Sequence, residues 1–373
     1  MAEVEYGVSK AVYHADKIKQ LQEGKQIIPL GIQIDLEAYC NDNCEFCSYR
    51  KDNGHNNMML NLIGAVPGEK YEDNKPIGKP SPMSRIPLEF AETLPRQLKE
   101  AGIRACELTG GGEPTLWPAF DQLYENLGLN GIEIGLITNG STMSDKRAAL
   151  VRKYGLWCRI SMDAATQETH KKLHRTANED FERRLNNIRK LTTDKPETLT
   201  VGISYIINQD NYKEIREAAK LYKELGVDHL RFSWMYDMEG NAGLTDEEKE
   251  WCKKTIRDCQ EKYQTDNYLI FTEYDRIDLY SKPNDDFKKC YYQHFVLAIG
   301  ADGGVYPCCI QKYYPEYQYA NIKEKTLKQI VTDINTKTFM DNLNPAGCNP
   351  CWLRNRNKSM AAAIEKPKHH NFI

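Results

Sequence analysis

Hydrophobic residues recur with two different periods along the first two thirds of the chain. Short apolar or alternating runs, typical of buried strands, are separated by longer stretches with the spacing of amphipathic helices. The predicted strands cover residues 30–36, 103–108, 131–137, 157–162, 199–207 and 229–234. The predicted helices between them cover residues 88–101, 118–127, 144–154, 180–191 and 212–225. Pro118 is expected in the first turn of its helix, and Gly226 is expected to cap the last one.

This alternation predicts six β–α units with right-handed crossovers, and therefore a parallel sheet. Six units are too few to close an eight-stranded barrel, so we expect an α/β fold, a partial (β/α)6 TIM-like barrel, over residues 28–235. Residues 1–27 precede it as an N-terminal extension. Residues 52–87 form an insertion longer than an ordinary βα loop. The insertion is either disordered or a lid over the substrate, and its origin at the expected active rim favours a lid.

The pattern changes after residue 235. A charged helix is predicted over residues 245–263, where Cys252 and Cys259 share one face and are interpreted as core thiols. A hairpin with the two-residue turn Asp302-Gly303 is predicted over residues 295–309, followed by a helix near residues 327–343. Residues 236–373 are therefore expected to form a small α+β domain with a tail.

Composition excludes several classes of protein. The 373 residues carry a formal net charge of −3, which gives no general attraction to nucleic acid. No apolar run reaches the ~18 residues of a membrane span, and the first residues show no secretory signal. Twelve cysteines in such a chain indicate metal ligands or reactive thiols rather than disulfides. We therefore expect a cytoplasmic protein without a membrane partner.

Seven of these cysteines form two sets of different size. Cys40, Cys44 and Cys47 directly follow the first strand, whereas Cys290, Cys308, Cys348 and Cys351 lie near the other end of the chain. Four thiolates complete the ligand set of an iron–sulfur cube, but three leave one iron free to bind another molecule. Zinc is the alternative metal for either set, although no second Cys/His pair lies near the first.

Further motifs follow the second, third and fourth strands at the same expected rim. Gly111, Gly112, Glu113 and Pro114 come after the second strand; the glycines allow close backbone approach, and a carboxylate there can accept hydrogen bonds from an ammonium group. Asn139 lies in a Thr-Asn-Gly turn after the third strand, Ser161 lies near the end of the fourth, and Arg175 follows later.

The Cys-x3-Cys-x2-Cys spacing and the Gly-Gly-Glu-Pro motif resemble the radical S-adenosylmethionine (SAM) enzymes over residues 28–235. The resemblance implies a 4Fe–4S cluster on Cys40, Cys44 and Cys47, with SAM on its fourth iron. It implies SAM contacts from Gly111, Gly112, Glu113, Pro114, Asn139, Ser161 and Arg175. An exposed helix-end arginine explains Arg175 equally well. The implied activity is reductive cleavage of SAM to a 5′-deoxyadenosyl radical that abstracts hydrogen from a substrate C–H bond, with a flavodoxin- or ferredoxin-type electron donor.

The order of Cys290, a hairpin ending in Cys308, a helix and Cys348-x2-Cys351 resembles the auxiliary-cluster domains called SPASM and Twitch. No cysteine follows Cys351, so the resemblance implies the shorter Twitch form with one auxiliary 4Fe–4S cluster, and two clusters in all. Cys309 is the alternative to Cys308 as a ligand. Otherwise it is a buried structural thiol or, as in epimerases of this family, a hydrogen-atom donor to a substrate radical.

A fully ligated auxiliary cluster passes electrons rather than binding substrate, which favours the net oxidation of a small molecule. A sugar, an aminocyclitol or a nucleotide is the expected substrate class. Modification or epimerisation of a peptide is the alternative. A zinc-binding protein or an electron carrier without SAM chemistry is a more distant one. An electron carrier does not explain the Gly-Gly-Glu-Pro motif, and a zinc-based nucleic-acid binder predicts a basic surface, whereas the net charge is −3.

Overall fold

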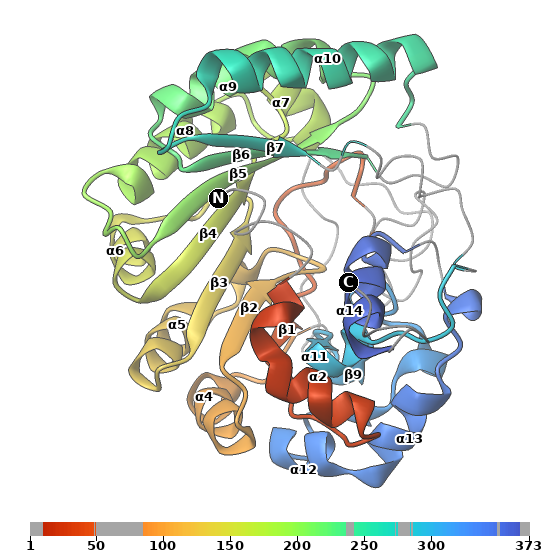
Figure 1. Cartoon of the computed structure of the whole chain (residues 1–373). Coiled ribbons are helices and arrows are strands. Elements are labelled where there is room, and N and C mark those ends of the chain that lie inside the picture. Colours follow the sequence, from red (N-terminus) through yellow and green to blue (C-terminus); the bar gives the residue numbers. More distant parts are fainter. Residues whose placement is uncertain are drawn as a thin grey trace.

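A ten-stranded sheet organises the chain, in the strand order β10-β9-β8-β1-β2-β3-β4-β5-β6-β7 (Figure 1). The computed structural model describes residues 10–47, 49, 85–235, 242–272, 274, 284, 286–348 and 351–365. Most of the insertion predicted over residues 52–87, and with it the choice between lid and disorder, lies outside these described residues. None of the described helices is long and apolar enough to cross a membrane.

Eight neighbouring strands of this sheet are parallel, and seven of them precede the C-terminal part. These seven are β1 (Gly31–Asp35), β2 (Ala105–Thr109), β3 (Glu133–Thr138), β4 (Gly155–Ser161), β5 (Thr200–Ile207), β6 (His229–Trp234) and β7 (Leu269–Thr272). The first six correspond to the six predicted strands. The seventh was not predicted, because a four-residue apolar run after the expected domain boundary gives little signal. The sheet is not closed, which confirms the partial barrel.

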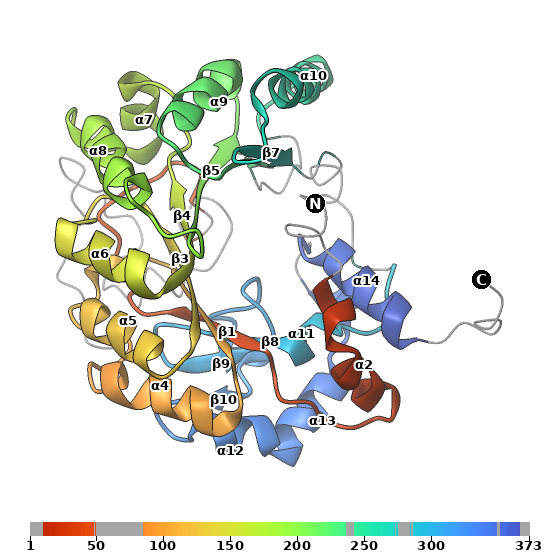
Figure 2. The same ribbon diagram turned by 60° about the vertical axis from the view of Figure 1, so that its left-hand side comes forward.

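Helices line the outer side of this curved sheet (Figure 2). They are α4 (Phe90–Ala101), α5 (Phe120–Leu129), α6 (Asp145–Tyr154), α7 (Gln167–His174), α8 (Asp180–Thr192), α9 (Ile215–Glu224) and α10 (Asp246–Tyr263). Their apolar faces and alternate strand residues such as Ile34, Leu108 and Ile160 form the main core. Pro118 lies before α5 rather than in its first turn, whereas Gly226, with φ of +71°, follows α9 as expected.

The C-terminal part extends the same sheet. β8 (Val296–Ile299) runs parallel to β1, and β9 (Gly304–Tyr306) and β10 (Ala320–Asn321) continue antiparallel. The predicted hairpin is present, but its two-residue turn was wrong: Gly300 bonds to Gly304, and Gly303 takes φ of +84° in the wider loop. The helices here are α2 (Ala15–Gln22), α11 (Tyr292–Phe295), α12 (Leu327–Thr332), α13 (Ile334–Asn342) and α14 (Arg354–Ile364). The helix predicted near residues 327–343 is split, because Asp333 caps α13.

Along each strand, residues that pack against the helices alternate with residues that point to the inner face of the sheet. Many of these inner residues are polar or charged. Glu107 lies opposite Gln33, Arg159 opposite Gly202, and Arg231 opposite Ser204. A Cβ at Gly202 would lie 1.9 Å from His229 Nε2, so glycine there leaves room for the imidazole. The carboxyl ends of the parallel strands thus surround a charged inner surface.

Candidate active site at the carboxyl edge of the sheet

The first cysteine set lies on the loop that follows β1. Cys40, Cys44 and Cys47 are free thiols of intermediate exposure. The loop is fastened to the end of α7 by backbone hydrogen bonds: Asn43 N donates to His174 O at 3.1 Å, and Glu45 N donates to Leu173 O at 2.9 Å. This thiol-rich loop has the donor chemistry that an iron–sulfur cluster requires.

The glycine motif after β2 packs against the start of this loop. A Cβ at Gly112 would lie 2.2 Å from Tyr39 O, so only glycine fits there. Glu113 N donates to the same carbonyl oxygen at 3.0 Å. Gly111 immediately precedes this contact, and Pro114 begins the short helix η4 (Pro114–Leu116). The structure therefore brings the predicted glycine motif and the cysteine loop together.

The Glu113 carboxylate joins the turns that follow β2 and β3. Its Oε1 accepts hydrogen bonds from Thr115 N at 3.1 Å and from Thr138 Oγ1 at 2.5 Å, and its Oε2 accepts one from Asn139 N at 2.7 Å. Burial raises the pKa of Glu113, and the hydrogen bonds from Asn139, Thr115 and Thr138 oppose that shift. Its role in holding the SAM amino group stays a prediction, because these donors already engage both oxygens.

Asn139 reaches the cysteine loop from the turn after β3. Its Nδ2 donates to Asn41 Oδ1 at 2.9 Å and lies 3.9 Å from Cys40 Sγ. Asn41 Nδ2 in turn donates to Ser141 Oγ at 2.9 Å. The predicted Asn139 therefore lies beside Cys40, together with two polar residues that the sequence did not single out.

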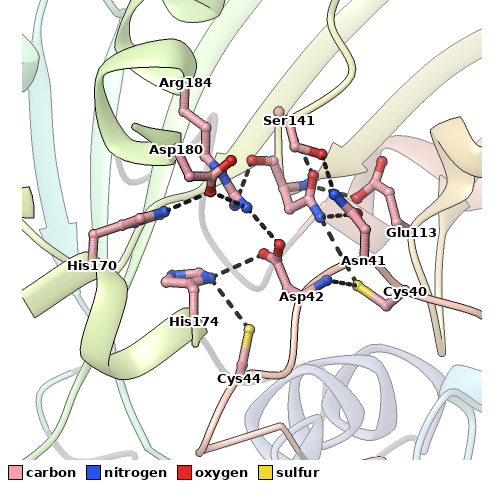
Figure 3. A network of polar contacts seen from close by, with 12 residues as sticks. Cys40, Asn41, Asp42, Cys44, Glu113, Ser141, His170, His174, Asp180 and Arg184 are labelled. Atoms are coloured by element: carbon pink, nitrogen blue, oxygen red, sulfur yellow. Dashed lines mark hydrogen bonds and ion pairs between the residues drawn. The ribbon is translucent and has the colours of Figure 1, made fainter. Parts of the chain in front are cut away.

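A buried ionic network, made of Asp42, His170, His174, Asp180 and Arg184, lies behind the loop (Figure 3). The Arg184 side chain is fully buried, and its Nη2 lies 2.5 Å from Asp42 Oδ1 and 2.7 Å from Asp180 Oδ2. His174 Nδ1 lies 3.1 Å from Asp42 Oδ2 and 3.3 Å from Cys44 Sγ. Burial alone would raise the pKa of Asp42, but Arg184 and His174 hold it well below its usual range. The network therefore keeps a carboxylate charged directly beside two cysteines.

Asp42, Cys44 and His174 also satisfy the distances of a mononuclear metal site, since their ligand atoms lie within 4.8 Å of one another. The Arg184 guanidinium that already binds Asp42 opposes a divalent cation there. This network was not predicted from the sequence, because charged residues in helices are usually exposed to solvent. A signal was present in α8, where Arg184 lies between the buried Phe181 and Leu185.

Ser161 and Arg175 lie at the same edge of the sheet. Ser161 ends β4 on the inner face and is half-buried. Arg175 caps α7 with φ of +52°, is partly exposed, and has Nη2 3.8 Å from Glu45 Oε1 on the cysteine loop. Both positions are compatible with SAM contacts, and for Arg175 the helix-end explanation holds as well.

The second cysteine set is assembled from separate segments around α11 and α14. Cys290, Cys308, Cys309 and Cys351 pack against one small apolar cluster that includes Tyr292, Phe295 and Leu353. Neutral amides fix the backbone around them. Asn284 donates to Cys348 O at 3.1 Å and accepts from Cys351 N at 3.2 Å. Asn357 accepts from Tyr291 N at 2.6 Å and donates to Lys289 O at 2.8 Å, on either side of Cys290.

Cys308 and Cys309 have different surroundings. Burial raises the pKa of the Cys308 thiol, and the neighbouring thiols of Cys309, Cys290 and Cys351 raise it further. Burial also raises the pKa of Cys309, but there Lys312 opposes the shift, and Glu107 is among the charges that act on it. Cys308 therefore has three other cysteines among its neighbours, whereas Cys309, which also lies near Cys351, has the charged groups Lys312 and Glu107 beside it.

A buried ion pair joins the second set to β1. Lys312 Nζ lies 2.5 Å from Asp35 Oδ1, and Tyr313 OH donates to Asp35 Oδ2 at 2.7 Å. Both side chains of the ion pair are almost fully buried. The segment after Cys309 is thus tied to the strand that leads into Cys40.

Comparisons with known proteins agree with this arrangement. Residues 38–222 match the family model of the radical SAM superfamily, and residues 290–352 match that of the iron–sulfur cluster-binding domain SPASM. The tungsten-containing aldehyde ferredoxin oxidoreductase cofactor-modifying protein of Pyrococcus furiosus is 24% identical over 71% of this chain and 78% of its own length. An S-adenosylmethionine-dependent nucleotide dehydratase of Flammeovirga pacifica is 27% identical over 43% of this chain and 47% of its own length.

Among solved structures, Streptococcus suis SuiB bound to the precursor peptide SuiA aligns with a TM-score of 0.61 at 16% identity. The alignment covers 90% of this chain and 72% of SuiB. At this identity the likeness concerns the fold alone, and it includes both the partial barrel and the C-terminal part.

Proposed function

Because the chain belongs to the radical SAM superfamily and carries a SPASM iron–sulfur cluster-binding domain, we propose that it catalyses the net oxidation of a small polar molecule. It is an enzyme of that superfamily, which binds SAM and iron–sulfur clusters. The proposed cofactor set is SAM with two 4Fe–4S clusters, and the proposed electron donor is a flavodoxin- or ferredoxin-type protein.

The proposal gives each cysteine set one task. Cys40, Cys44 and Cys47 hold the first cluster, and Cys290, Cys308, Cys348 and Cys351 hold the second. The first cluster and SAM supply a 5′-deoxyadenosyl radical that abstracts a hydrogen atom from the substrate. Gly111, Gly112, Glu113, Pro114, Asn139, Ser161 and Arg175 would orient SAM, and Cys290, Cys308, Cys348 and Cys351 would hold a cluster that supplies an acceptor for the electron leaving the substrate.

The buried Asp35–Lys312 ion pair carries the proposal, because it joins the two cysteine sets along one polar inner surface. Glu107, Arg159 and Arg231 belong to that surface. Burial raises the pKa of Glu107, and Arg159 is the main charge that opposes the shift. Such charged groups suit a substrate with many hydrogen-bonding groups, such as a sugar, an aminocyclitol or a nucleotide. Cys309 borders this surface; under the epimerisation alternative, and not under net oxidation, its thiol would donate a hydrogen atom to the substrate radical.

A peptide substrate is the second candidate, because the fold is similar to that of SuiB, which was solved with a precursor peptide. The nucleotide dehydratase among the relatives supports the small-molecule proposal instead. The two candidate functions share the radical chemistry and differ only in the class of substrate that binds at the inner surface of the sheet.

Anaerobic reconstitution of the full chain with iron and sulfide, followed by SAM and dithionite, tests the radical chemistry. The expected results are 5′-deoxyadenosine and about eight irons per chain, four for each cube. A zinc protein would take up zinc and form no 5′-deoxyadenosine. An electron carrier would hold iron without cleaving SAM.

A panel of sugars, aminocyclitols and nucleotides, set against a panel of synthetic peptides, tests the substrate class. The measurement is the 5′-deoxyadenosine formed above the level without substrate, with deuterium transferred from labelled substrate. Stimulation confined to peptides would contradict the small-molecule proposal and leave the radical chemistry standing.

A further inference from the structure

We propose that His174 is a positioning residue that donates a hydrogen bond to Cys44 Sγ and thereby raises the reduction potential of the cluster on the Cys40 loop. This inference rests on the proposed function, because it takes Cys40, Cys44 and Cys47 as the ligands of that cluster. It goes beyond it in assigning a task to a side chain outside the cysteine and glycine motifs.

The atoms around the imidazole make it a donor on both sides. Nδ1 faces Cys44 Sγ at 3.3 Å and Asp42 Oδ2 at 3.1 Å. Nε2 faces Met162 O at 3.1 Å and Asp163 Oδ2 at 3.2 Å. A carboxylate, a thiolate and a carbonyl oxygen all accept hydrogen bonds. The proton on Nδ1 is therefore shared between Asp42 and Cys44.

The ring is held in this orientation by its neighbours. The His174 side chain is buried and stacks on His170, with the ring centroids 4.4 Å apart at an interplanar angle of 21°. Phe46, from the cysteine loop itself, packs edge-on with its centroid 5.8 Å away. The His174 carbonyl accepts the hydrogen bond from Asn43 N, so the backbone and the side chain of His174 both contact the cysteine loop.

A hydrogen bond to a ligand sulfur withdraws electron density from the thiolate. Hydrogen bonds to the sulfurs are among the factors that set the potential of an iron–sulfur cluster, and groups that bond to ligands commonly tune metal sites. A donor that is fixed before the electron arrives favours the reduced cluster. The donors to Cys40 are neutral amides, Asp42 N at 3.4 Å and Asn139 Nδ2 at 3.9 Å, whereas the imidazole faces Cys44.

His170 provides a matched control one turn earlier on α7. It is as buried as His174 and belongs to the same network, with Nε2 3.1 Å from Asp180 Oδ2 and Nδ1 3.3 Å from Met162 O. Its hydrogen bonds go to oxygen atoms and not to a cysteine. Substituting it disturbs the same helix and network without removing the hydrogen bond to sulfur.

The test compares the reconstituted full chain with its His174→Leu, His174→Gln and His170→Gln variants. The reduced cluster whose electron paramagnetic resonance signal changes on adding SAM is titrated potentiometrically. For His174→Leu we expect reduction to become at least about tenfold less favourable, a downward shift of about 59 mV for one electron. His174→Gln should shift less, since its amide can still donate one bond. His170→Gln should shift clearly less than His174→Leu, because it removes a stacking partner of the ring but keeps Nδ1 on Cys44 Sγ.

Each other outcome has a defined meaning. A wild-type potential in His174→Leu, or an equal shift in His170→Gln, would overturn the inference. If His174→Leu does not take up iron, His174→Gln decides: a potential equal to that of the wild type and of His170→Gln overturns the inference. The absence of any SAM-responsive signal in the wild type would refute the proposed function instead, so the two failures are distinguishable.

Discussion

The two cysteine sets are held by different kinds of side chain. Around the first set the contacts are ionic: Arg184, Asp42 and His174 form a buried chain of charges that ends at Cys44. Around the second set the groups that bond to the backbone beside the cysteines are neutral amides, Asn284 and Asn357. The ion pairs of this region, Arg354–Asp286 and Lys312–Asp35, lie one residue further out. Charged side chains thus act directly on the cysteine loop of the first set, whereas amide hydrogen bonds fix the backbone beside the second.

This difference matches what each site has to do. Burying charged groups costs hydration free energy. In some proteins such buried ionic networks are retained because they select one conformation of the segments that they join. Under the proposed function the first set supplies only three thiolates, so the geometry of its loop would have to hold a fourth iron open to SAM. Under the same proposal the second set supplies four thiolates that would define their own geometry, and neutral amides beside them cost less desolvation than buried charges.

Removing one thiolate from each set should give the largest effects and the clearest contrast. Cys44→Ala is expected to abolish 5′-deoxyadenosine formation, because SAM loses its iron. Cys351→Ala is expected to retain SAM cleavage but to lose substrate oxidation and about four irons per chain, one cube. The measurements are iron content and 5′-deoxyadenosine after anaerobic reconstitution.

Cys252→Ala is the control for both variants, since Cys252 is buried in α10 and belongs to neither set. It should keep the full iron content and full SAM cleavage. Equal loss of SAM cleavage in the Cys44 and Cys351 variants would break the division between an open and a closed site.

Local patterns in the sequence account for most of the barrel. Parallel strands buried on one face against helices read as apolar runs, which is why all six predicted strands are present. β7 was not predicted because it is short. α7 was not predicted because its buried residues include two histidines rather than an apolar stripe. The motifs on the loops after β1, β2 and β3 were found because cysteine and glycine carry local chemical constraints.

Contacts between distant segments could not be predicted in this way. The pairing of β8 with β1 joins strands from opposite ends of the chain, and the Asp35–Lys312 ion pair spans 277 residues. No local sequence pattern indicates a contact partner that lies so far away along the chain. Arg184 and Asp42, separated by 142 residues, were missed for the same reason, since each charge alone is typical of an exposed position.

Substitutions in the two scaffolds should differ in size. Arg184→Leu leaves the Asp42 and Asp180 carboxylates buried without their cation, which typically costs about 3–5 kcal/mol of the free energy of unfolding. Asn357→Leu removes neutral hydrogen bonds around Cys290, with an expected cost of about 1–3 kcal/mol. Urea unfolding of the reconstituted chain, followed by far-ultraviolet circular dichroism under anaerobic conditions, measures both.

Iron content locates each effect. Arg184→Leu should release iron from the SAM-responsive cluster first, whereas Asn357→Leu should release it from the other. As a control, Lys220→Leu removes an exposed charge from α9, whose partner Glu224 is also exposed, and should leave stability within about 0.5 kcal/mol. If Asn357→Leu were as destabilising as Arg184→Leu, the contrast between ionic and amide scaffolds would not hold.

The smallest effect should be a pH dependence near the second set, where the scaffolding amides do not titrate. Burial lowers the pKa of His294, on α11, to about 4. Its unfolded pKa of about 6.5 is higher, so the unfolded chain binds more protons between these values. Stability from the neutral imidazole is therefore complete above the unfolded pKa and falls as the pH is lowered toward 4.

From pH 7 to pH 5 this histidine should cost the wild type about 1–2 kcal/mol of unfolding free energy. Asp341, Lys337 and Lys289 are the charges that act on it, and they remain in a His294→Gln variant. That variant should lose less stability over the same interval in urea unfolding of the reconstituted chain. Other histidines contribute equally to both proteins, so the difference between them isolates His294. An identical pH dependence in the two proteins would contradict the prediction, because it would show that the protonation of His294 does not contribute to stability in this interval.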